Sequence, residues 1–205
     1  MIALIDHNVS NIRNVQRAFV RCGVDAEIIS DPARLRAARG AVAPGVGAFG
    51  QAMANLRALG FVDAIHEFVA SGRPFAGICV GMQLLFEESE ELGQHVGLGL
   101  MKGRVKRFTG DVRVPHMGWN QLRIERDTPL LAHIPSESYA YFANSFHCVP
   151  SDASVTCATT DYSLPFVSVA TRDNLYAFQF HPEKSQQVGL QILKNFAKLA
   201  GEKID

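Results

Sequence analysis

Residues 74–86 of the chain read PFAGICVGMQLLF, and the spacing of their hydrophobic residues changes at Cys79. The segment before the cysteine is a continuous apolar run, which is typical of a buried strand in a parallel sheet. After the cysteine, Met82, Leu85 and Phe86 recur at the spacing of one helix face. The pattern therefore predicts a strand, a sharp turn that carries Cys79, and a helix.

Two glycines flank Cys79, two residues before it and two residues after it. Gly77 and Gly81 stand where a side chain would clash as the chain doubles back. The segment therefore has the Gly-x-nucleophile-x-Gly form of a nucleophile elbow, with cysteine in place of serine. The unpaired N–H groups and the dipole at the start of the following helix favour a thiolate. A free cysteine is most often a small buried hydrophobic residue, but the flanking glycines favour a nucleophile.

The composition indicates a globular protein whose partners are small molecules or other proteins. The chain has 205 residues, enough for one substantial core, and we expect a single domain over residues 1–205. The formal net charge is zero, and no basic run suggests a surface for nucleic acid. The chain meets a charge at Asp6, and its longest apolar run is far shorter than a membrane span. We therefore expect a cytoplasmic protein that does not enter a membrane.

The four cysteines show no Cys-x-x-Cys spacing. Without that spacing and without a secretory context, neither disulfides nor a thiolate metal cage is expected. We therefore interpret Cys22, Cys148 and Cys157 as structural residues.

The first half of the chain alternates between strand and helix patterns. Besides the run before Cys79, buried strands are expected at 2–5, 26–29 and 40–43. Helices are expected after the Asp31-Pro32 pair, over 53–59 and 61–69, and after Ser10, where a capped helix carries one apolar face made of Ile12, Val15, Phe19 and Val20. This alternation predicts a doubly wound parallel sheet, whose ligand sites lie beyond the carboxyl ends of the strands.

The second half of the chain has shorter strand patterns. They lie at 103–108, 121–124, 139–146, 154–158, 166–170 and 175–180. We expect them to add antiparallel strands to the same sheet, and we expect a closing helix that carries Val188, Ile192, Phe196 and Leu199. The predicted fold is α/β, with a mixed, mainly parallel, doubly wound sheet flanked by helices.

A cysteine nucleophile needs a base, and the base needs an orienting group. His181 follows an alternating strand pattern, and Pro182 separates it from Glu183. Proline disfavours a helix here, so we expect an extended segment in which the side chains of His181 and Glu183 point to one side. Glu183 can then accept a hydrogen bond from one imidazole nitrogen while the other nitrogen faces the thiol. The remaining histidines have no such paired carboxylate and are interpreted as structural or surface residues.

The segment 44–50 reads PGVGAFG and matches Gly-x-Gly-x-x-Gly. A dinucleotide site would place this motif in the first strand-to-helix turn, but here it follows the third strand. Glycines also allow backbone N–H groups to approach a reacting carbonyl. We therefore favour an oxyanion hole made by Gly45, Val46 and Gly47 together with the amide of Val80, over a dinucleotide site or a plain turn.

Together these segments resemble the class I glutamine amidotransferases, in which a Cys-His-Glu triad hydrolyses glutamine and passes ammonia to a synthase. The resemblance covers essentially the whole chain and rests on Gly77–Gln83 and on Phe180–Ser185. Within the family, the segment Pro115-His-Met-Gly-Trp-Asn120 and the Pro44–Gly47 turn are similar to the glutaminase subunits that serve histidine biosynthesis.

The resemblance implies a role for individual residues. Cys79 would be the nucleophile, His181 the acid and base, and Glu183 its orienter. Gln83 and Glu91 would hold the head group of glutamine, aided by the backbone around Asn144 and Ser145. Residues facing the partner subunit would be Asn11, Asn14, Trp119 and Lys184. Two segments depart from the family pattern: the first loop, His7–Asn11, which lacks the usual glycines, and position 144, where a histidine is common.

The resemblance also implies a partner. No metal or organic cofactor is needed for thiolate chemistry on an amide, and the chain has no phosphate-binding loop with which to activate an acceptor. The implied partner is a (βα)8-barrel cyclase subunit, which would form a heterodimer with this chain. We also expect the chain alone to be a poor glutaminase, since the glycine turn can hold an N–H away from the oxyanion position until the partner binds.

Three alternatives stay open on the sequence alone. They are the glutaminase of another synthase, for example in anthranilate or pyridoxal phosphate synthesis, a stand-alone γ-glutamyl-type cysteine hydrolase, and a degenerate binding subunit. The Trp119 segment argues against the first, and the joint presence of Cys79, His181 and Glu183 argues against the third.

Overall fold

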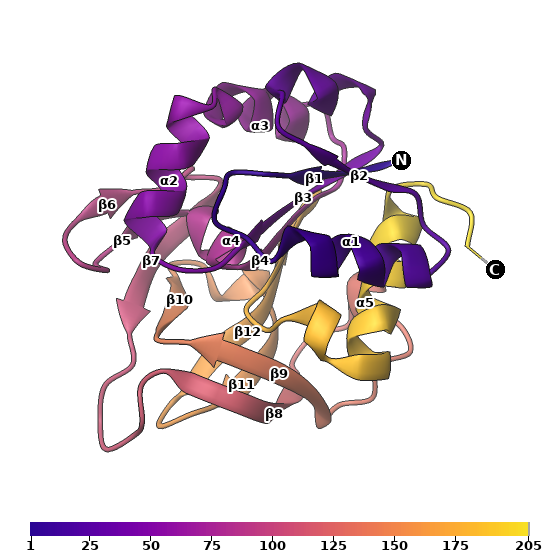
Figure 1. Cartoon of the computed structure of the whole chain (residues 1–205). Helices are drawn as coiled ribbons and strands as arrows, with labels where there is room; N and C mark the ends of the chain where they lie inside the picture. Colours follow the sequence, from indigo (N-terminus) through magenta and orange to yellow (C-terminus); the bar gives the residue numbers. More distant parts are fainter. Residues whose placement is uncertain (205) are drawn as a thin grey trace.

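The computed structural model describes residues 1–204, and its main sheet has nine strands in the order β2-β1-β3-β4-β13-β12-β11-β8-β9 (Figure 1). The parallel part consists of β2 (Ala26–Ile29), β1 (Ile2–Ile5), β3 (Gly40–Gly45), β4 (Phe75–Cys79) and β13 (Leu175–Phe178). The antiparallel part consists of β12 (Pro165–Arg172), β11 (Thr156–Asp161), β8 (His116–Ile124) and β9 (Ser138–Asn144). The mixed, doubly wound sheet predicted from the sequence is confirmed.

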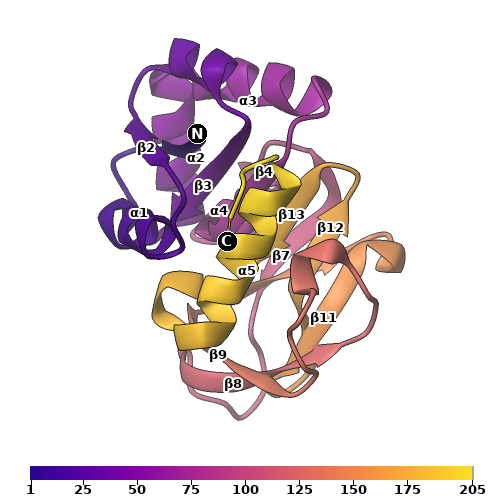
Figure 2. The same ribbon diagram turned by 90° about the vertical axis from the view of Figure 1, so that its right-hand side faces the viewer.

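Helices cover the parallel part of the sheet. α1 (Ile12–Arg21) and α5 (Gln186–Leu199) lie together, with the rings of Phe19 and Phe196 in a tilted contact at 6.5 Å (Figures 1 and 2). α2 (Phe49–Ala58) and α3 (Phe61–Ala70) connect β3 to β4, and right-handed crossovers place them on the opposite face from α1. Short helical turns complete the chain: α4 (Val80–Leu84), η1 (Pro32–Ala37), η2 (Pro129–Leu131), η3 (Ala153–Val155) and η4 (Pro182–Lys184).

The start of α1 differs from its sequence-based prediction. Asn11, not Ser10, occupies the N-cap position, and its side chain makes no capping hydrogen bond. The face toward the core carries Ile12, Val15 and Phe19, whereas Val20 is 62% exposed. Neighbouring residues on a helix point about 100° apart, so Val20 turns away from the core when Phe19 faces it. The prediction for Val20 was therefore wrong.

The segment after the elbow also differs from its prediction. α4 ends at Leu84, and Phe86 begins a strand, β5 (Phe86–Ser89), instead of continuing the helix. Within β5 the ends are buried and Glu87 and Glu88 are exposed. A run of a few apolar residues fits either periodicity, and here pairing with β7 (Met101–Arg107) decides the outcome.

A second, four-stranded sheet was not predicted. Its order is β10-β7-β5-β6, with β10 at Phe146–Pro150 and β6 at His95–Val96. The pattern at 103–108 therefore belongs to this sheet, and the pattern at 139–146 divides at Ser145 between β9 and β10. After this break, β10 pairs antiparallel with β7 in the second sheet.

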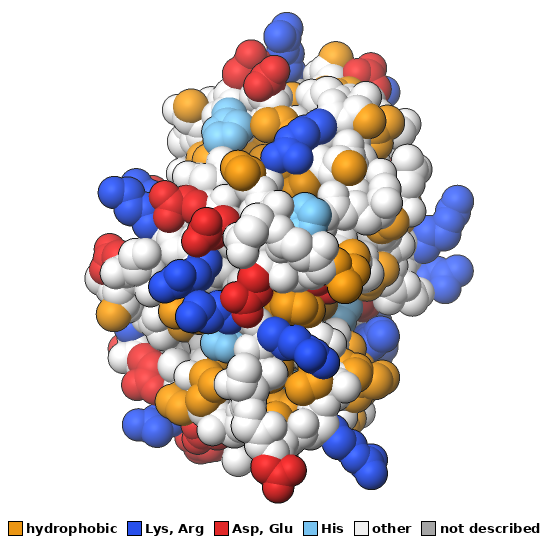
Figure 3. Space-filling view, turned by 90° about the vertical axis from the view of Figure 1, so that its left-hand side faces the viewer, with side chains coloured by type: hydrophobic (Ala, Val, Ile, Leu, Met, Phe, Trp, Pro, Cys, Tyr) orange, Lys and Arg blue, Asp and Glu red, His pale blue; other side chains and the backbone are white. Residues whose placement is uncertain are grey.

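One continuous hydrophobic core joins these elements, and its largest fully buried side chains are phenylalanines. In contrast, the face shown in Figure 3 carries acidic and basic side chains interspersed with small hydrophobic ones. Within residues 1–204, no helix is long and apolar enough to cross a membrane. The rigid core fixes the carboxyl ends of β3, β4 and β13 next to one another, which is where the candidate site lies.

Candidate active site

Cys79 lies at the end of β4 in a backbone conformation that residues other than glycine rarely adopt, with φ 55° and ψ −111°. A Cβ on Gly77 would lie 2.4 Å from the carbonyl oxygen of Gly81, and a Cβ on Gly81 would lie 1.7 Å from that of Ala43. Both positions therefore require glycine, because at each of them another stretch of backbone lies too close to leave room for a side chain. This geometry is that of the nucleophile elbow, although α4 has only five residues, so its dipole is weaker than that of a full helix.

The turn η4 brings His181 and Glu183 together. The His181 N–H donates to the carbonyl oxygen of Tyr141 at 2.9 Å, and the Ser185 hydroxyl donates to the carbonyl oxygen of His181 at 2.7 Å. His181 Nδ1 lies 3.0 Å from Glu183 Oε1, and the two side chains are only 5% and 1% exposed. The segment is a helical turn and not the extended segment that we expected, but the predicted pairing of the two side chains is present.

The electrostatics of His181 favour its charged form. Burial alone would lower the pKa of His181, but its interactions with Cys79 and Glu183 outweigh burial and raise the pKa to about 10. The imidazole is therefore protonated at neutral pH while it faces the thiol on one side and a carboxylate on the other. Such a pair is the resting state expected of a cysteine activated by histidine.

Asn11 contacts Glu183, which the sequence did not indicate. Its side-chain amide donates to Glu183 Oε1 at 3.1 Å, and Asn14 donates in turn to Asn11 Oδ1 at 2.7 Å. The first turn of α1 is thereby joined to the carboxylate that holds His181. Two residues that we expected at a partner surface thus form a hydrogen-bonded path from that surface to the imidazole.

A solvent-open cavity of about 300 Å³ lies over Cys79 and His181. All but one of the residues that we predicted to hold substrate line it: Val46, Gly47, Val80, Gln83, Glu91, Asn144 and Ser145. The exception, Gly45, lies beneath the cavity, where a Cβ would come within 2.9 Å of the Gly81 nitrogen and of Val80 Cβ. The volume suits a small polar molecule.

Two polar side chains of the cavity have defined partners. Glu91 Oε2 accepts a hydrogen bond from the N–H of Phe49, at the start of α2, at 2.6 Å. The Asn144 amide nitrogen donates to the carbonyl oxygen of Phe146 at 2.9 Å. Among the described residues Asn144 Oδ1 has no partner although it is buried, so it can accept a hydrogen bond from a ligand.

The glycine turn does not point its second amide into the cavity. The Val46 N–H donates to the carbonyl oxygen of Val9 at 3.0 Å, and Gly47 has a φ of 82°. His7 holds the same turn, because its Nε2 lies 2.6 Å from the carbonyl oxygen of Pro44. Burial lowers the pKa of His7, so the ring is neutral at pH 7 and Nε2 carries the proton that Pro44 accepts. His7 is thus part of the support for the turn.

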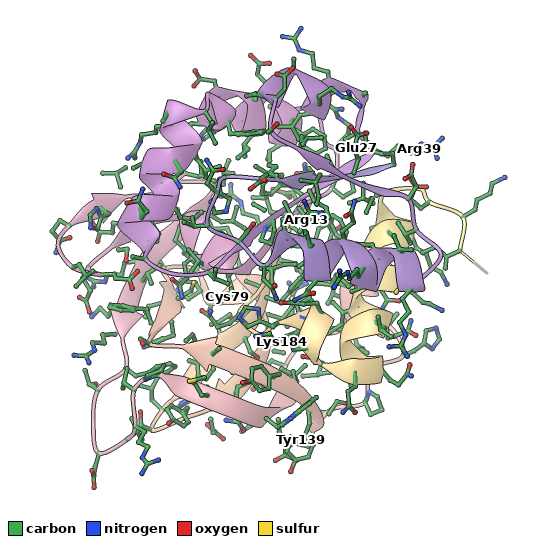
Figure 4. All side chains as sticks on the ribbon, viewed as in Figure 1. Arg13, Glu27, Arg39, Cys79, Tyr139 and Lys184 are labelled. Atoms are coloured by element: carbon green, nitrogen blue, oxygen red, sulfur yellow. The ribbon has the colours of Figure 1, made fainter. Side chains whose placement is uncertain are left out.

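Trp119 and Lys184 both contact the ring of Tyr141. The Trp119 ring is 44% exposed and meets the Tyr141 ring edge to face at 6.0 Å, while Lys184 Nζ lies 5.4 Å from the centre of the same ring. Figure 4 shows Lys184 close to Cys79 in the middle of the molecule, with Tyr139 at the outer edge. Lys184 lines the cavity over Cys79, whereas Trp119 lines a separate surface hollow together with Tyr139 and Gln186.

Gln179 is a neighbour of Cys79 that the sequence analysis did not single out. Its side chain is fully buried, and its amide nitrogen lies 3.6 Å from Cys79 Sγ. The only signal in the sequence is a polar residue inside the apolar run Phe178-Gln179-Phe180. Across residues 1–204 no cluster of three His, Cys, Asp or Glu side chains is arranged to hold a metal ion.

The family and the relatives can now be compared with this site. The model of the family "Glutamine amidotransferase class-I" matches residues 3–200. Proteins named imidazole glycerol phosphate synthase subunit HisH are 51% identical in Syntrophotalea carbinolica and 48% identical in Moorella thermoacetica. These alignments cover 97% of this chain in both cases, and 100% and 94% of the two relatives.

Solved structures share the fold at low identity. A structure described as a glutamine amidotransferase has a TM-score of 0.78 at 20% identity and covers 98% of this chain and 100% of its own. The structure of PurLQS from Thermotoga maritima has a TM-score of 0.76 at 17% identity, with 97% and 96% covered. At sequence identities this low, the similarity to these two structures shows a shared fold and nothing more.

Proposed function

The chain belongs to the class-I glutamine amidotransferase family, and from this premise we propose that it is the glutaminase subunit of imidazole glycerol phosphate synthase. The single observation that carries the chemistry is the position of Cys79 and the His181–Glu183 pair at one cavity. The relatives named as this subunit at about half identity over nearly the whole chain support the choice of synthase.

In the proposed reaction, the Cys79 thiolate attacks the side-chain amide carbon of glutamine. The oxyanion that forms is held by the backbone N–H of Val80 and by an N–H of the glycine turn. His181 gives its proton to the leaving ammonia, which leaves a thioester between glutamate and Cys79. His181 then takes a proton from water as the water attacks the thioester, and glutamate departs. Glu183 keeps Nδ1 of His181 protonated and the ring in place throughout.

The cavity suggests how glutamine is held. Its reactive amide lies over Cys79, and its charged head group reaches the opposite wall, where Glu91 and Asn144 Oδ1 can accept hydrogen bonds from the α-ammonium group. The Ser145 segment closes the same wall. Gly45 acts indirectly in this proposal, because its lack of a side chain lets the turn approach the elbow.

The partner in this proposal is a (βα)8-barrel cyclase, which joins the chain in a heterodimer. It uses the ammonia to form imidazole glycerol phosphate and aminoimidazole carboxamide ribonucleotide during histidine biosynthesis. Asn11, Asn14, Trp119 and Lys184 face this subunit. We assign residues 1–205 to one amidotransferase domain and place the reaction in the cytoplasm, in keeping with four cysteines that are all free and buried.

The test uses the complex with the cyclase. Cys79→Ala is expected to abolish synthesis from glutamine and to leave synthesis from added ammonium salts largely intact, since only the first half-reaction needs a thiolate. Both rates are measured by product formation under the same conditions. Equal loss of the two activities would show that Cys79 supports the fold or the interface, and equal retention would show that it is not the nucleophile.

A further inference from the structure

Two buried side-chain amides connect a backbone carbonyl to the sulfur of Cys79. The Gln83 amide nitrogen donates to the carbonyl oxygen of Phe146 at 3.1 Å and to Gln179 Oε1 at 3.1 Å. The Gln179 amide nitrogen in turn donates to Cys79 Sγ at 3.6 Å. These contacts join residues that are 63, 96 and 100 positions apart in the chain.

The direction of every hydrogen bond in this series follows from its first member. A backbone carbonyl can only accept, so the nitrogen of Gln83 must face Phe146. That nitrogen also faces Gln179, which must therefore present its oxygen to Gln83. The remaining end of the Gln179 amide, its nitrogen, then points at the sulfur. The order of donors is fixed by chemistry and not by a choice between two similar amide orientations.

Both amides are held away from solvent and away from other partners. Gln179 is fully buried, and Gln83 is 3% exposed. The backbone of Gln179 is fixed by a hydrogen bond from its N–H to the carbonyl oxygen of Ser168 at 3.0 Å. A buried amide that gave up these contacts would lose hydrogen bonds without gaining water, which stabilises this arrangement of the two side chains.

We propose that Gln179 is a donor to the reacting sulfur of Cys79 and that Gln83 is a positioning residue that orients it. A thiolate accepts a hydrogen bond from an amide more strongly than a neutral thiol does, because the acceptor is charged. The donor therefore favours the reactive, charged form of Cys79.

A second consequence concerns glutamine binding and rests on the proposed function. Both protons of the Gln83 amide nitrogen are already used, by Phe146 and Gln179. Only Gln83 Oε1 is left to meet the substrate, so Gln83 can accept a hydrogen bond from glutamine but cannot donate one.

The test measures the reaction of Cys79 with iodoacetamide as a function of pH, in the full chain, by mass spectrometry of the peptide that contains Cys79. Gln179→Met keeps the length of the side chain and removes the donor. We expect the midpoint of the pH profile to rise by about one pH unit, which slows the reaction about tenfold at pH values below both midpoints. Gln16→Met is the control for the substitution itself, because the Gln16 side-chain amide also donates a hydrogen bond, to the carbonyl oxygen of Ala26, but lies on α1. An unchanged midpoint in Gln179→Met, or an equal shift in Gln16→Met, overturns the proposal.

A double-variant cycle tests the order of the series. Gln83→Met is expected to raise the midpoint by less than Gln179→Met, and to add nothing when Gln179→Met is already present. Additive shifts would overturn the role of Gln83. If Gln179→Met does not fold, Gln83→Met alone decides, since an unchanged midpoint there contradicts the orienting role. The readout is a property of the thiol, so it can fail or succeed independently of whether glutamine is the substrate.

Discussion

Glu183 offers one oxygen, Oε1, to two donors, His181 Nδ1 and the Asn11 amide. Its other oxygen, Oε2, is buried without a hydrogen-bond partner among residues 1–204. A buried carboxylate in this position is stabilised mainly by the positive charge of the imidazole, just as the imidazole is stabilised by the carboxylate. The two groups therefore act as a unit, and removing either one affects the other.

At this scale we predict different effects for two substitutions. His181→Asn should reduce glutamine-dependent synthesis by roughly 10⁶-fold, as for loss of a catalytic base. Glu183→Gln should reduce it by roughly 10⁴-fold, because the base remains but is no longer oriented or stabilised. The measurement is the ratio of the rate of synthesis from glutamine to the rate from ammonium salts, for each variant with the cyclase present. A larger effect for Glu183→Gln than for His181→Asn would contradict these roles.

The sequence predicted the residues that stand in local motifs and missed those that depend on packing. Cys79, His181 and Glu183 are marked by glycines, a proline and a strand pattern within a few positions. In contrast, Asn11 contacts Glu183 across 172 positions, and Gln179 contacts Cys79 across 100. No local pattern contains that information, since each contact depends on which strands become neighbours.

At the scale of elements, β1, β2, β3 and β4 were predicted because buried parallel strands are short, continuous apolar runs bounded by turn residues. β13 was expected among the antiparallel strands, and that prediction was wrong for its pairing with β4, which is parallel. The second sheet was not predicted, since β5 and β6 are too short to show a clear period and the alternating pattern of β7 fits either sheet. Which sheet a strand joins is decided by long-range pairing, for example β5 with β7 in parallel. Pairing with β7 also explains why the helix after Cys79 is shorter than predicted, because Phe86 begins β5 instead of extending that helix.

The contact between β8 and its neighbours contains a buried histidine. His116 stacks on Tyr162 at 3.9 Å and on Phe142 at 5.0 Å. Burial lowers the pKa of His116 from 6.5 to about 4, so the ring is neutral in the folded protein at neutral pH. Its Nε2 faces the Asn120 amide at 3.3 Å, and its Nδ1 has no partner in the described chain.

We predict that this histidine makes stability depend on pH. Between about pH 6.5 and 4 the unfolded chain binds a proton at His116 and the folded chain does not, so the free energy of unfolding falls as pH falls, by up to about 1.4 kcal/mol per pH unit. Urea unfolding at pH 7 and pH 5 measures the difference. His116→Phe keeps a ring between Tyr162 and Phe142 and should reduce the difference. Identical differences in the two proteins would exclude His116 as the cause.

At the scale of the whole molecule, the carboxyl edge of the sheet places the cavity, the glycine turn and the proposed partner surface side by side. The turn is in a state in which the Val46 N–H is bound to Val9. That amide cannot donate to an oxyanion without breaking this hydrogen bond. The loop that carries Val9 leads directly into Asn11 and α1, so a subunit docked there could change the turn.

We predict that the chain alone hydrolyses glutamine slowly. A missing oxyanion donor typically lowers the rate by roughly a hundred- to a thousand-fold, about 3 to 4 kcal/mol. The rate of glutamate release is measured for the chain alone, with the cyclase, and with the cyclase and an analogue of its acceptor substrate. The last rate should be the highest by about that factor. If the chain alone releases glutamate as fast as the complex with the acceptor analogue, then binding of the cyclase does not activate the glutaminase. A stand-alone γ-glutamyl-type hydrolase would then be the better description of the chain.

The left-handed backbone of Cys79 also affects how firmly the protein is folded. Holding a residue with a side chain at φ 55° and ψ −111° destabilises the folded state by about 1–3 kcal/mol, whereas glycine adopts this region freely. Cys79→Gly should therefore melt several degrees above Cys79→Ala, even after the greater chain entropy of unfolded glycine is subtracted. Calorimetry of the two inactive variants tests this order. Such a result would mean that position 79 trades stability for activity: glycine there would give a more heat-resistant protein, but only cysteine supplies the nucleophile.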